Sequence, residues 1–234
     1  MTVAKNVAYG LSKWPKARRA QRVAELLELV GLADLADRKP PELSGGQAQR
    51  VALARSLAPE PRALMLDEPL SALDRGLRER LAEDLSRILR ETNTTALYVT
   101  HDHEEAFVIA DDVAIMADGK IIQHDSPEVV WQTPASKAVA AFLGFRTFLT
   151  QATATKLGWD GTLNVGYVLG VGPHNFDITD DGVEVPILDQ GFAPDHVEIG
   201  VRLPDGQCCV VAHGVRLSGD TTRIRLTGGA PIPA

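Results

Sequence analysis

Two carboxylates follow a short apolar run near the middle of the chain. The run ALML, residues 63–66, leads directly into Asp67 and Glu68. If the run is a strand of a parallel sheet, both acids lie at its carboxyl end, where α/β folds bind ligands. Consecutive residues face different ways, so Asp67 can support Mg²⁺ through water while Glu68 faces an attacking water. A strand end with two solvated acids is the alternative that the pair alone leaves open.

A glycine-containing stretch, LSGGQAQR, occupies residues 43–50 upstream of these acids. Ser44 can cap a helix that follows, and Gly45 and Gly46 let the backbone approach an anion closely. The positive end of that helix adds to the exposed N–H groups, which makes phosphate binding possible without a lysine. A glycine-containing capping turn explains the stretch equally well.

Two further stretches follow the acids. The stretch LSALD, residues 70–74, is either part of a site or a helix start capped by Asp74. The apolar run TALYVT ends directly before His101, which can contact a phosphate or orient a nucleophile, or can be structural. His103 is expected on the following helix, with a surface role.

Helical and strand patterns alternate over the first 145 residues and would position these side chains. Helical periodicity covers 16–30, 46–57, 75–91, a segment through Glu105 and Ala110, and 136–143. Strands are expected at 63–66, buried on both faces, and at 95–100, with a hairpin around 117–119. This alternation predicts an α/β sheet with crossover connections.

The pattern changes after Phe145. Glycine and proline separate runs that alternate with period two, namely GVEVPIL, HVEIGVRL, CCVVAHGVRL and TRIRL. They predict short antiparallel strands in a small sandwich or barrel, and so two domains, 1–145 and 146–234. Cys208 and Cys209 would point to opposite faces of a strand, poorly placed for a shared metal, and are expected to be buried or half-buried thiols.

The bulk composition excludes several classes. The 234 residues are 44% hydrophobic, which is typical of a globular protein with a core, and the net charge of −7 argues against a dedicated nucleic-acid binder. No apolar run approaches the ~20 residues that cross a bilayer, and no signal-peptide pattern opens the sequence. We therefore expect a cytosolic protein that can still dock onto a membrane protein.

The motifs LSGGQ, LMLDEP, SALD and THD occur in this order, and over residues 1–145 the chain resembles the ATPase subunits of ABC transporters. The resemblance implies an α/β P-loop NTPase fold with a helical subdomain. It makes Glu68 the catalytic glutamate, His101 the switch histidine and Asp67 a support for Mg²⁺ through water. It also implies a signature motif that binds the ATP of a partner subunit (in trans), formed by Ser44, Gly45, Gly46 and Gln47. The D-loop would be Ser71, Ala72, Leu73 and Asp74.

The second half narrows the resemblance to importers. The stretches DSPEVVWQTPASKAVAAFLG and FAPDHVEIG resemble those around the small barrel-like TOBE domain, an OB-like fold, of importer ATPases. The sequence of these stretches is most similar to that of the iron(III), thiamine and polyamine uptake systems. The resemblance implies ATP and Mg²⁺ as cofactors, a head-to-tail homodimer, transmembrane permease subunits, and indirectly an extracytoplasmic binding protein. It places the protein in the cytoplasm, peripheral on the inner face of the membrane, with no nucleic-acid partner.

One element of that family has no counterpart in the sequence. The phosphate cradle G-x-x-x-x-G-K-[ST] does not occur, because the single glycine–lysine pair, Gly119–Lys120, is followed by Ile121. The glutamine-bearing loop is also missing. We therefore expect an N-terminally truncated chain, through a misplaced start codon, a frameshift or a damaged gene, that is inactive alone. The alternatives are a degenerate subunit that lends only its signature and a non-transport ABC protein.

Overall fold

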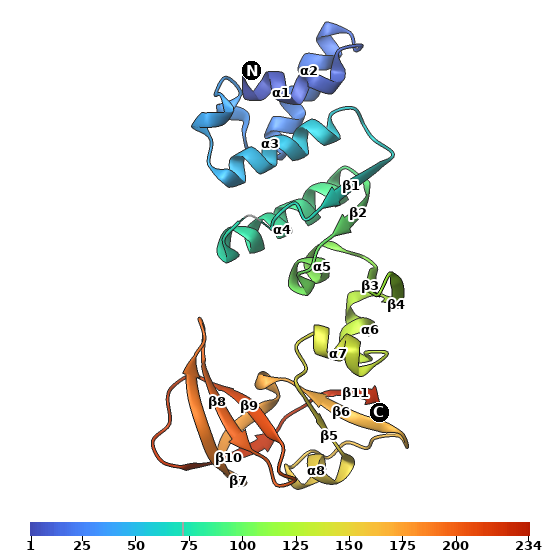
Figure 1. The fold of residues 1–234 in the computed structure, drawn as a ribbon. Coiled ribbons are helices and arrows are strands. Elements are labelled where there is room, and N and C mark those ends of the chain that lie inside the picture. The colour runs from blue at the N-terminus through green and yellow to red at the C-terminus, as the bar shows by residue number, and fades with distance from the viewer. Residues whose placement is uncertain (72) are drawn as a thin grey trace. The chain divides into compact units, whose positions relative to one another are not determined.

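The computed structural model describes residues 1–71 and 73–234. The chain divides into two compact units, Met1–Asp111 and Asp112–Ala234 (Figure 1). The boundary expected after residue 145 lies inside the second unit, after its first hairpin and directly before strand β5 (Thr147–Leu149). Among the described residues, no helix is both long and apolar enough to cross a membrane.

The first unit is mainly helical. The predicted helices are confirmed to within two residues at their N-terminal ends, and Val23, Leu26 and Val30 are buried as their spacing predicts. The short helix α1 and the 3₁₀ turns were not predicted. The helices of this unit are α1 (Val3–Val7), α2 (Lys16–Leu29), α3 (Gly45–Leu57), α4 (Arg75–Glu91) and α5 (His103–Ile109).

A two-stranded parallel sheet completes the first unit. Strand β1 (Ala63–Asp67) pairs with β2 (Thr95–Val99) in register, and α4 makes the predicted crossover between them. The expectation that β1 is buried on both faces is wrong, because described residues cover only the face that carries Leu64. On the other face Met65 is 77% exposed and its register partner Leu97 is 57% exposed.

The second unit begins with the predicted hairpin. Strands β3 (Val113–Ala117) and β4 (Lys120–Asp125) are antiparallel, and the turn residues Asp118 and Gly119 have φ of 49° and 73°. Two positive φ angles at the centre of a two-residue turn match the twist of the strands, and aspartate and glycine tolerate them best. Helices α6 (Pro127–Gln132) and α7 (Lys137–Phe142) follow, of which only α7 was predicted.

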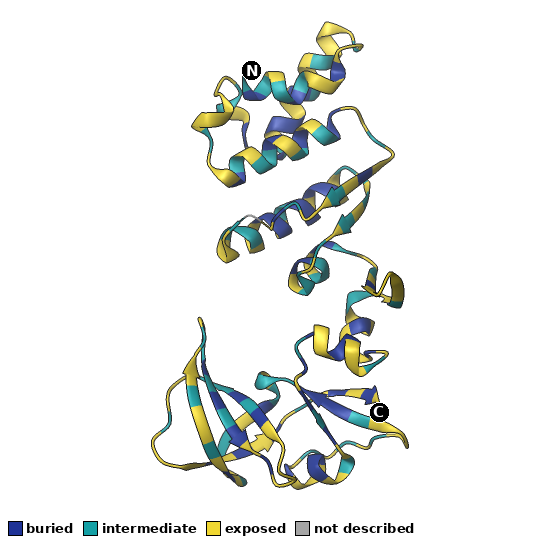
Figure 2. Ribbon diagram, in the orientation of Figure 1, coloured by how far each residue is buried: buried dark blue, intermediate teal, exposed yellow. Residues whose placement is uncertain are grey.

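The remainder of the second unit is β-rich, as predicted. Its four-stranded antiparallel sheet has the order β10 (Thr221–Leu226), β7 (Phe176–Phe192), β8 (Val197–Arg202), β9 (Cys208–His213). Its three-stranded sheet has the order β11 (Ala230–Pro233), β6 (Tyr167–Val171), β5. Buried and exposed residues alternate along β10 (Figure 2). Side chains from both sheets, such as Leu169 and Ile199, share one core, which is a sandwich-like arrangement.

Several details of this region were not predicted. The run CCVVAHGVRL is a strand only as far as His213, and β5, β6, β11 and helix α8 gave no recognised pattern. Helix α8 spans Gln151–Lys156, between β5 and β6.

The two cysteines lie on opposite faces of β9, as expected, but only one is buried. Cys208 is exposed, which corrects the expectation of two buried or half-buried thiols, and Cys209 is 4% exposed in the core. Burial raises the pKa of the Cys209 thiol to about 11. The thiolate is the reactive form, so both access and ionisation protect Cys209.

We therefore expect iodoacetamide at mildly alkaline pH to alkylate Cys208 rapidly and Cys209 slowly in the native chain. Peptide mass spectrometry at timed quenches measures the two rates. The control is the same reaction in concentrated urea, where the rates should converge. Equal rates in the native chain would contradict the assigned orientation of β9.

Candidate functional site

The parallel pairing of β1 with β2 brings Glu68 and His101 together. Each residue lies just beyond the carboxyl end of its strand, and the N–H of Glu68 donates to the carbonyl of Val99 at 2.9 Å. The Nδ1 atom of His101 lies 3.4 Å from Oε1 of Glu68. Their side chains are 70% and 50% exposed, so both can reach a ligand from solvent.

The backbone at Glu68 is in the left-handed region, with φ of 43°. This conformation is uncommon for a residue other than glycine, and the contacts of the surrounding turn must offset its cost. The carbonyl of Glu68 accepts from the backbone N–H of Ser71 at 3.3 Å and from its hydroxyl at 2.9 Å. A tight turn therefore holds the glutamate at the strand end.

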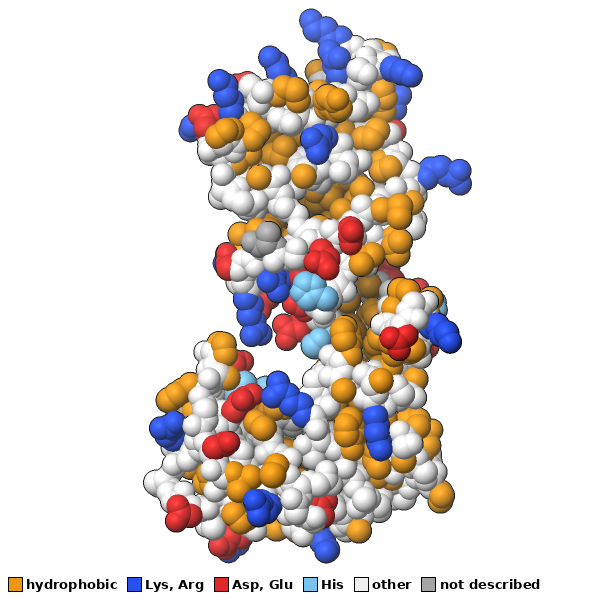
Figure 3. All heavy atoms as spheres, in the orientation of Figure 1, with side chains coloured by type: hydrophobic (Ala, Val, Ile, Leu, Met, Phe, Trp, Pro, Cys, Tyr) orange, Lys and Arg blue, Asp and Glu red, His pale blue; other side chains and the backbone are white. Residues whose placement is uncertain are grey.

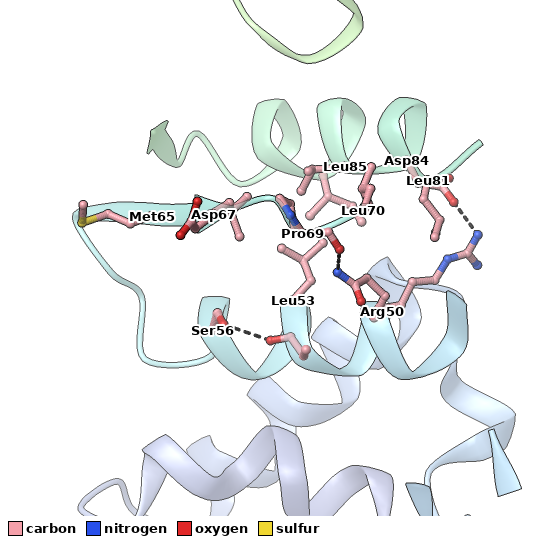
Figure 4. A pocket seen from close by; sticks show the side chains of 14 residues that line it. Arg50, Leu53, Ser56, Met65, Asp67, Pro69, Leu70, Leu81, Asp84 and Leu85 are labelled. Atoms are coloured by element: carbon pink, nitrogen blue, oxygen red, sulfur yellow. Dashed lines mark hydrogen bonds and ion pairs between the residues drawn. The ribbon is translucent and has the colours of Figure 1, made fainter. Parts of the chain in front are cut away.

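The neighbouring Asp67 faces a different region, as predicted for consecutive residues. It lines a cavity of about 220 Å³ between α3, β1 and α4, together with apolar side chains such as Leu53 and Leu85 (Figure 4). Among the described residues, no group of three or more His, Cys, Asp or Glu side chains is placed to hold a metal. A single carboxylate matches the way Mg²⁺ binds when nucleotide phosphates and waters supply its other ligands.

The stretch LSGGQ forms the start of α3 and is a reciprocal capping box. The Ser44 hydroxyl accepts from the N–H of Gln47 at 3.3 Å, and the Gln47 side chain accepts from the N–H of Ser44 at 2.9 Å. The N–H groups of Gly45 and Gly46 belong to the first helical turn, which has no intrahelical acceptors for them. The turn is thus a helix cap in which two glycine N–H groups have no intrahelical acceptor; Gly45 is exposed and Gly46 is buried.

Gly46 also has a packing role that sequence reasoning did not identify. It is buried, and a Cβ atom at this position would lie 3.1 Å from Cδ1 of Leu77 on α4. A Cβ on Gly45 would lie 3.7 Å from the Leu73 side chain. The glycines therefore let α3 approach α4 and the loop before it closely.

Two further contacts join α3 to the strand-end loop and to α4. The Gln49 amide donates to the carbonyl of Pro69, and Arg50 forms an ion pair with Asp84 (Figure 4). Gln49 and Arg50 follow LSGGQ directly, but sequence reasoning assigned them no role. The first contact fixes α3 against the segment that follows Glu68, and the second fixes it against α4.

The loop from 70 to 74 adopts the helix-start arrangement that was one of its two interpretations. The Asp74 carboxylate accepts from the N–H of Leu77 at 3.0 Å and caps α4. Ser71 donates from its hydroxyl to the carbonyl of Glu68, and Leu73 lies beside Gly45. Ala72 lies outside the described residues. His103 begins α5 and makes an edge-to-face contact with Phe107, with ring centroids 6.0 Å apart.

Sequence reasoning missed the buried carboxylate of Glu105, which lies on α5, four residues after His101. Glu105 is 5% exposed and accepts from the Tyr98 hydroxyl at 2.7 Å and the Thr100 hydroxyl at 2.9 Å. Burial, and then the hydrogen bond to Glu105, raise the pKa of Tyr98 well above its ordinary value, so Tyr98 remains a donor. The available pattern was the four-residue spacing from Glu105 to the buried Ile109, which places an acid on an apolar helix face.

The acidic and histidine side chains gather on one face of the first unit, over α5 and the end of β2 (Figure 3). Of the predicted residues, the structure brings Glu68, Ser71 and His101 into one contact group. The LSGGQ turn lies on a separate element, α3. Its Gly45 lies close to the side chain of Leu73, which belongs to the segment that follows Ser71. This surface therefore carries the carboxylate of Glu68 and the imidazole of His101, with the start of α3 nearby.

Comparison with known proteins supports an assignment for this surface. A sequence profile described as "ABC transporter" matches residues 1–71. The spermidine/putrescine import ATP-binding protein PotA 1 of Pseudomonas aeruginosa is 37% identical over 98% of this chain and 69% of its own length. The Fe(3+) ions import ATP-binding protein FbpC of Streptomyces coelicolor is 40% identical over 99% of this chain and 73% of its own length.

A third relative and one solved structure are more partial matches. The sulfate/thiosulfate import ATP-binding protein CysA of Ralstonia nicotianae is 44% identical over 82% of this chain. The structure of CbiO1 from Clostridium perfringens, part of the ABC transporter complex CbiONQ, is 32% identical and superposes with a TM-score of 0.52. That match covers 55% of this chain and 52% of CbiO1.

The chain spans between 42% and 73% of the length of these and similar curated relatives. Identity over nearly all of its residues with two import ATP-binding proteins nevertheless goes beyond shared motifs. It agrees with the family indicated by the order of LSGGQ, LMLDEP, SALD and THD. The chain therefore belongs to the ABC transporter family, among the ATP-binding subunits of importers.

Proposed function

We propose that this chain supplies the hydrolytic residues and the signature of an importer's energy-coupling ATPase. The observation that carries the proposal is the Glu68–His101 pair, held 3.4 Å apart at the ends of two parallel strands. Adjacent strand ends of a parallel sheet are where such folds bind ligands. An exposed carboxylate beside an exposed imidazole has the groups needed to polarise water and to stabilise the charge that develops on a phosphate.

In this proposal Glu68 accepts a proton from the attacking water and His101 contacts the transferred phosphate. Asp67 holds Mg²⁺ through water, and the ion neutralises charge on the phosphates when it is bound. Ser44 and the N–H groups of Gly45 and Gly46 contact the nucleotide of a second, head-to-tail subunit, with Gln47 beside them. The free N–H donors at the start of α3 support that role.

The location and partners follow from the same proposal. The protein would act in the cytoplasm, on the inner face of the membrane, bound to transmembrane permease subunits that receive substrate from an extracytoplasmic binding protein. Names of relatives support an import role, and those names include spermidine/putrescine, Fe(3+) ions and sulfate/thiosulfate. We place the substrate among iron(III), thiamine and polyamines.

The first test is Glu68→Gln, in a polypeptide where the chain follows a relative's segment carrying G-x-x-x-x-G-K-[ST]. We expect ATP binding to persist and turnover to fall by ~10²–10⁴-fold, because general-base assistance is lost. The measurement is phosphate release together with equilibrium nucleotide binding.

The matched control is Glu60→Gln. Glu60 is also half-exposed and has a left-handed backbone, with φ of 56°, but its carboxylate pairs with Arg18 away from the strand ends. It should leave turnover unchanged. Equal turnover in the Glu68→Gln protein and the unsubstituted protein would remove Glu68 from the proposed role.

The second test separates the two uses of Ser44. Ser44→Ala removes the cap of α3 and should lower the free energy of unfolding by about 1 kcal/mol, measured by urea denaturation. Ser44→Asp keeps a capping acceptor but places a negative charge where the partner's phosphate would lie. We expect Ser44→Asp to fold normally and to lose stimulation of a partner subunit that has the phosphate cradle.

The control for this test is Ser136, which caps α7 through the N–H of Val139 at 3.3 Å. Ser136→Ala should cost a similar stability, and Ser136→Asp should leave stimulation intact. Stimulation that survives Ser44→Asp would refute the phosphate contact.

A further inference from the structure

One guanidinium connects the loops on both sides of the candidate site. Arg78, on the first turn of α4, donates from Nη2 to the carbonyl of Leu73 at 3.0 Å and from Nη1 to Oδ2 of Asp102 at 3.1 Å. Its Nε atom lies 3.5 Å from Oε1 of Glu105, in an ion pair. A planar guanidinium presents five N–H donors in a fixed fork, whereas the compact ammonium of lysine offers three donors around one atom and cannot span acceptors on different loops in the same way.

The residues on both sides of His101 are each held by this group of side chains. Thr100 donates to Glu105 through its hydroxyl at 2.9 Å, and the N–H of Asp102 donates back to the Thr100 hydroxyl at 3.0 Å. Asp102 also caps α5 by accepting from the N–H of Glu104 at 2.9 Å. His101 therefore lies between two anchored residues while its own imidazole stays exposed.

The buried charges explain why this arrangement is a single unit. The Glu105 side chain is 6% exposed, and among the described ion pairs its counter-charge is the half-buried Arg78, which also pairs with Asp102. Tyr98 occupies a further lone pair of the Glu105 carboxylate at 2.7 Å. Loss of any one member leaves a buried polar group without its partner, which makes the loops around His101 free to rearrange.

We propose that Arg78 and Glu105 are positioning residues that lock the loop carrying His101 to the loop before α4, and so keep His101 within reach of Glu68. The catalytic purpose of this positioning rests on the proposed function, whereas the test below needs no ATPase activity. Neither residue touches the reacting groups. Through Leu73, the same guanidinium would transmit a shift of the 70–74 loop to the histidine.

The test reads the contact between Glu68 and His101 by NMR, with no nucleotide present. In the full chain labelled with ¹⁵N and ¹³C, Glu68→Gln should shift the ring resonances of His101, because it removes an anion 3.4 Å from Nδ1. In chains that also carry Arg78→Lys, Arg78→Gln or Glu105→Gln, we expect that shift to be lost. Glu105→Gln has the same shape as glutamate, and Arg78→Lys keeps the charge, so at least one variant should stay folded.

The matched control is Arg87→Gln on the same helix, since Arg87 pairs only with Asp84 and Glu91 of α4 among the described ion pairs. It should leave the Glu68-dependent shift of His101 intact. A merely structural role would lower the urea midpoint but preserve the shift in the folded fraction. A full shift in a folded Arg78→Lys or Glu105→Gln chain would overturn the proposal, whereas failure of the ATPase tests would leave it standing.

Discussion

The parallel pairing of β1 with β2 is the constraint on which the rest of the first unit depends. In-register pairing from Ala63–Thr95 to Asp67–Val99 ends both strands at one edge, and the hydrogen bond from Glu68 to Val99 closes that edge. Parallel strands need a crossover, and α4 supplies it while carrying Arg78 to the same edge. A slip of the register by one residue would exchange the exposed and half-buried faces of β2 and separate Glu68 from His101.

Three helices begin at this part of the unit, and each starts with a side-chain cap. Ser44 caps α3, Asp74 caps α4 and Asp102 caps α5. The same short polar side chains that end the preceding loops also fix the direction of each helix. Folding and proposed chemistry therefore use the same residues, so an alanine substitution at a cap reports on both, and charge-retaining or cap-retaining variants are needed to separate them.

Much of this arrangement could be predicted from local patterns. Spacing of apolar residues located α2, α3 and α4, and the run into Asp67 and Glu68 predicted a strand end with diverging acids. The exposed face of β1 could not be predicted, because ALML has no alternation and burial depends on which elements cover each face.

The Arg78–Glu105 contacts were also beyond local patterns, since they join α4 and α5, whose packing is a tertiary property. Gly46 shows the same limit. Its position at a helix start was evident, whereas its close approach to Leu77 depends on how α3 and α4 pack. In the second unit, β5, β6 and β11 are short strands whose pairing partners lie far away in sequence, so no single window contained enough alternation to indicate them.

A nuclear Overhauser spectrum of the isotopically labelled chain tests directly whether the paired strand ends hold Glu68 and His101 together. We expect a cross-peak between the ring protons of His101 and the γ protons of Glu68, since Nδ1 and Oε1 lie 3.4 Å apart. We also expect a cross-peak between the Glu68 amide proton and Val99. Assigned resonances for these residues without either cross-peak would contradict the claim that paired strand ends hold Glu68 and His101 together.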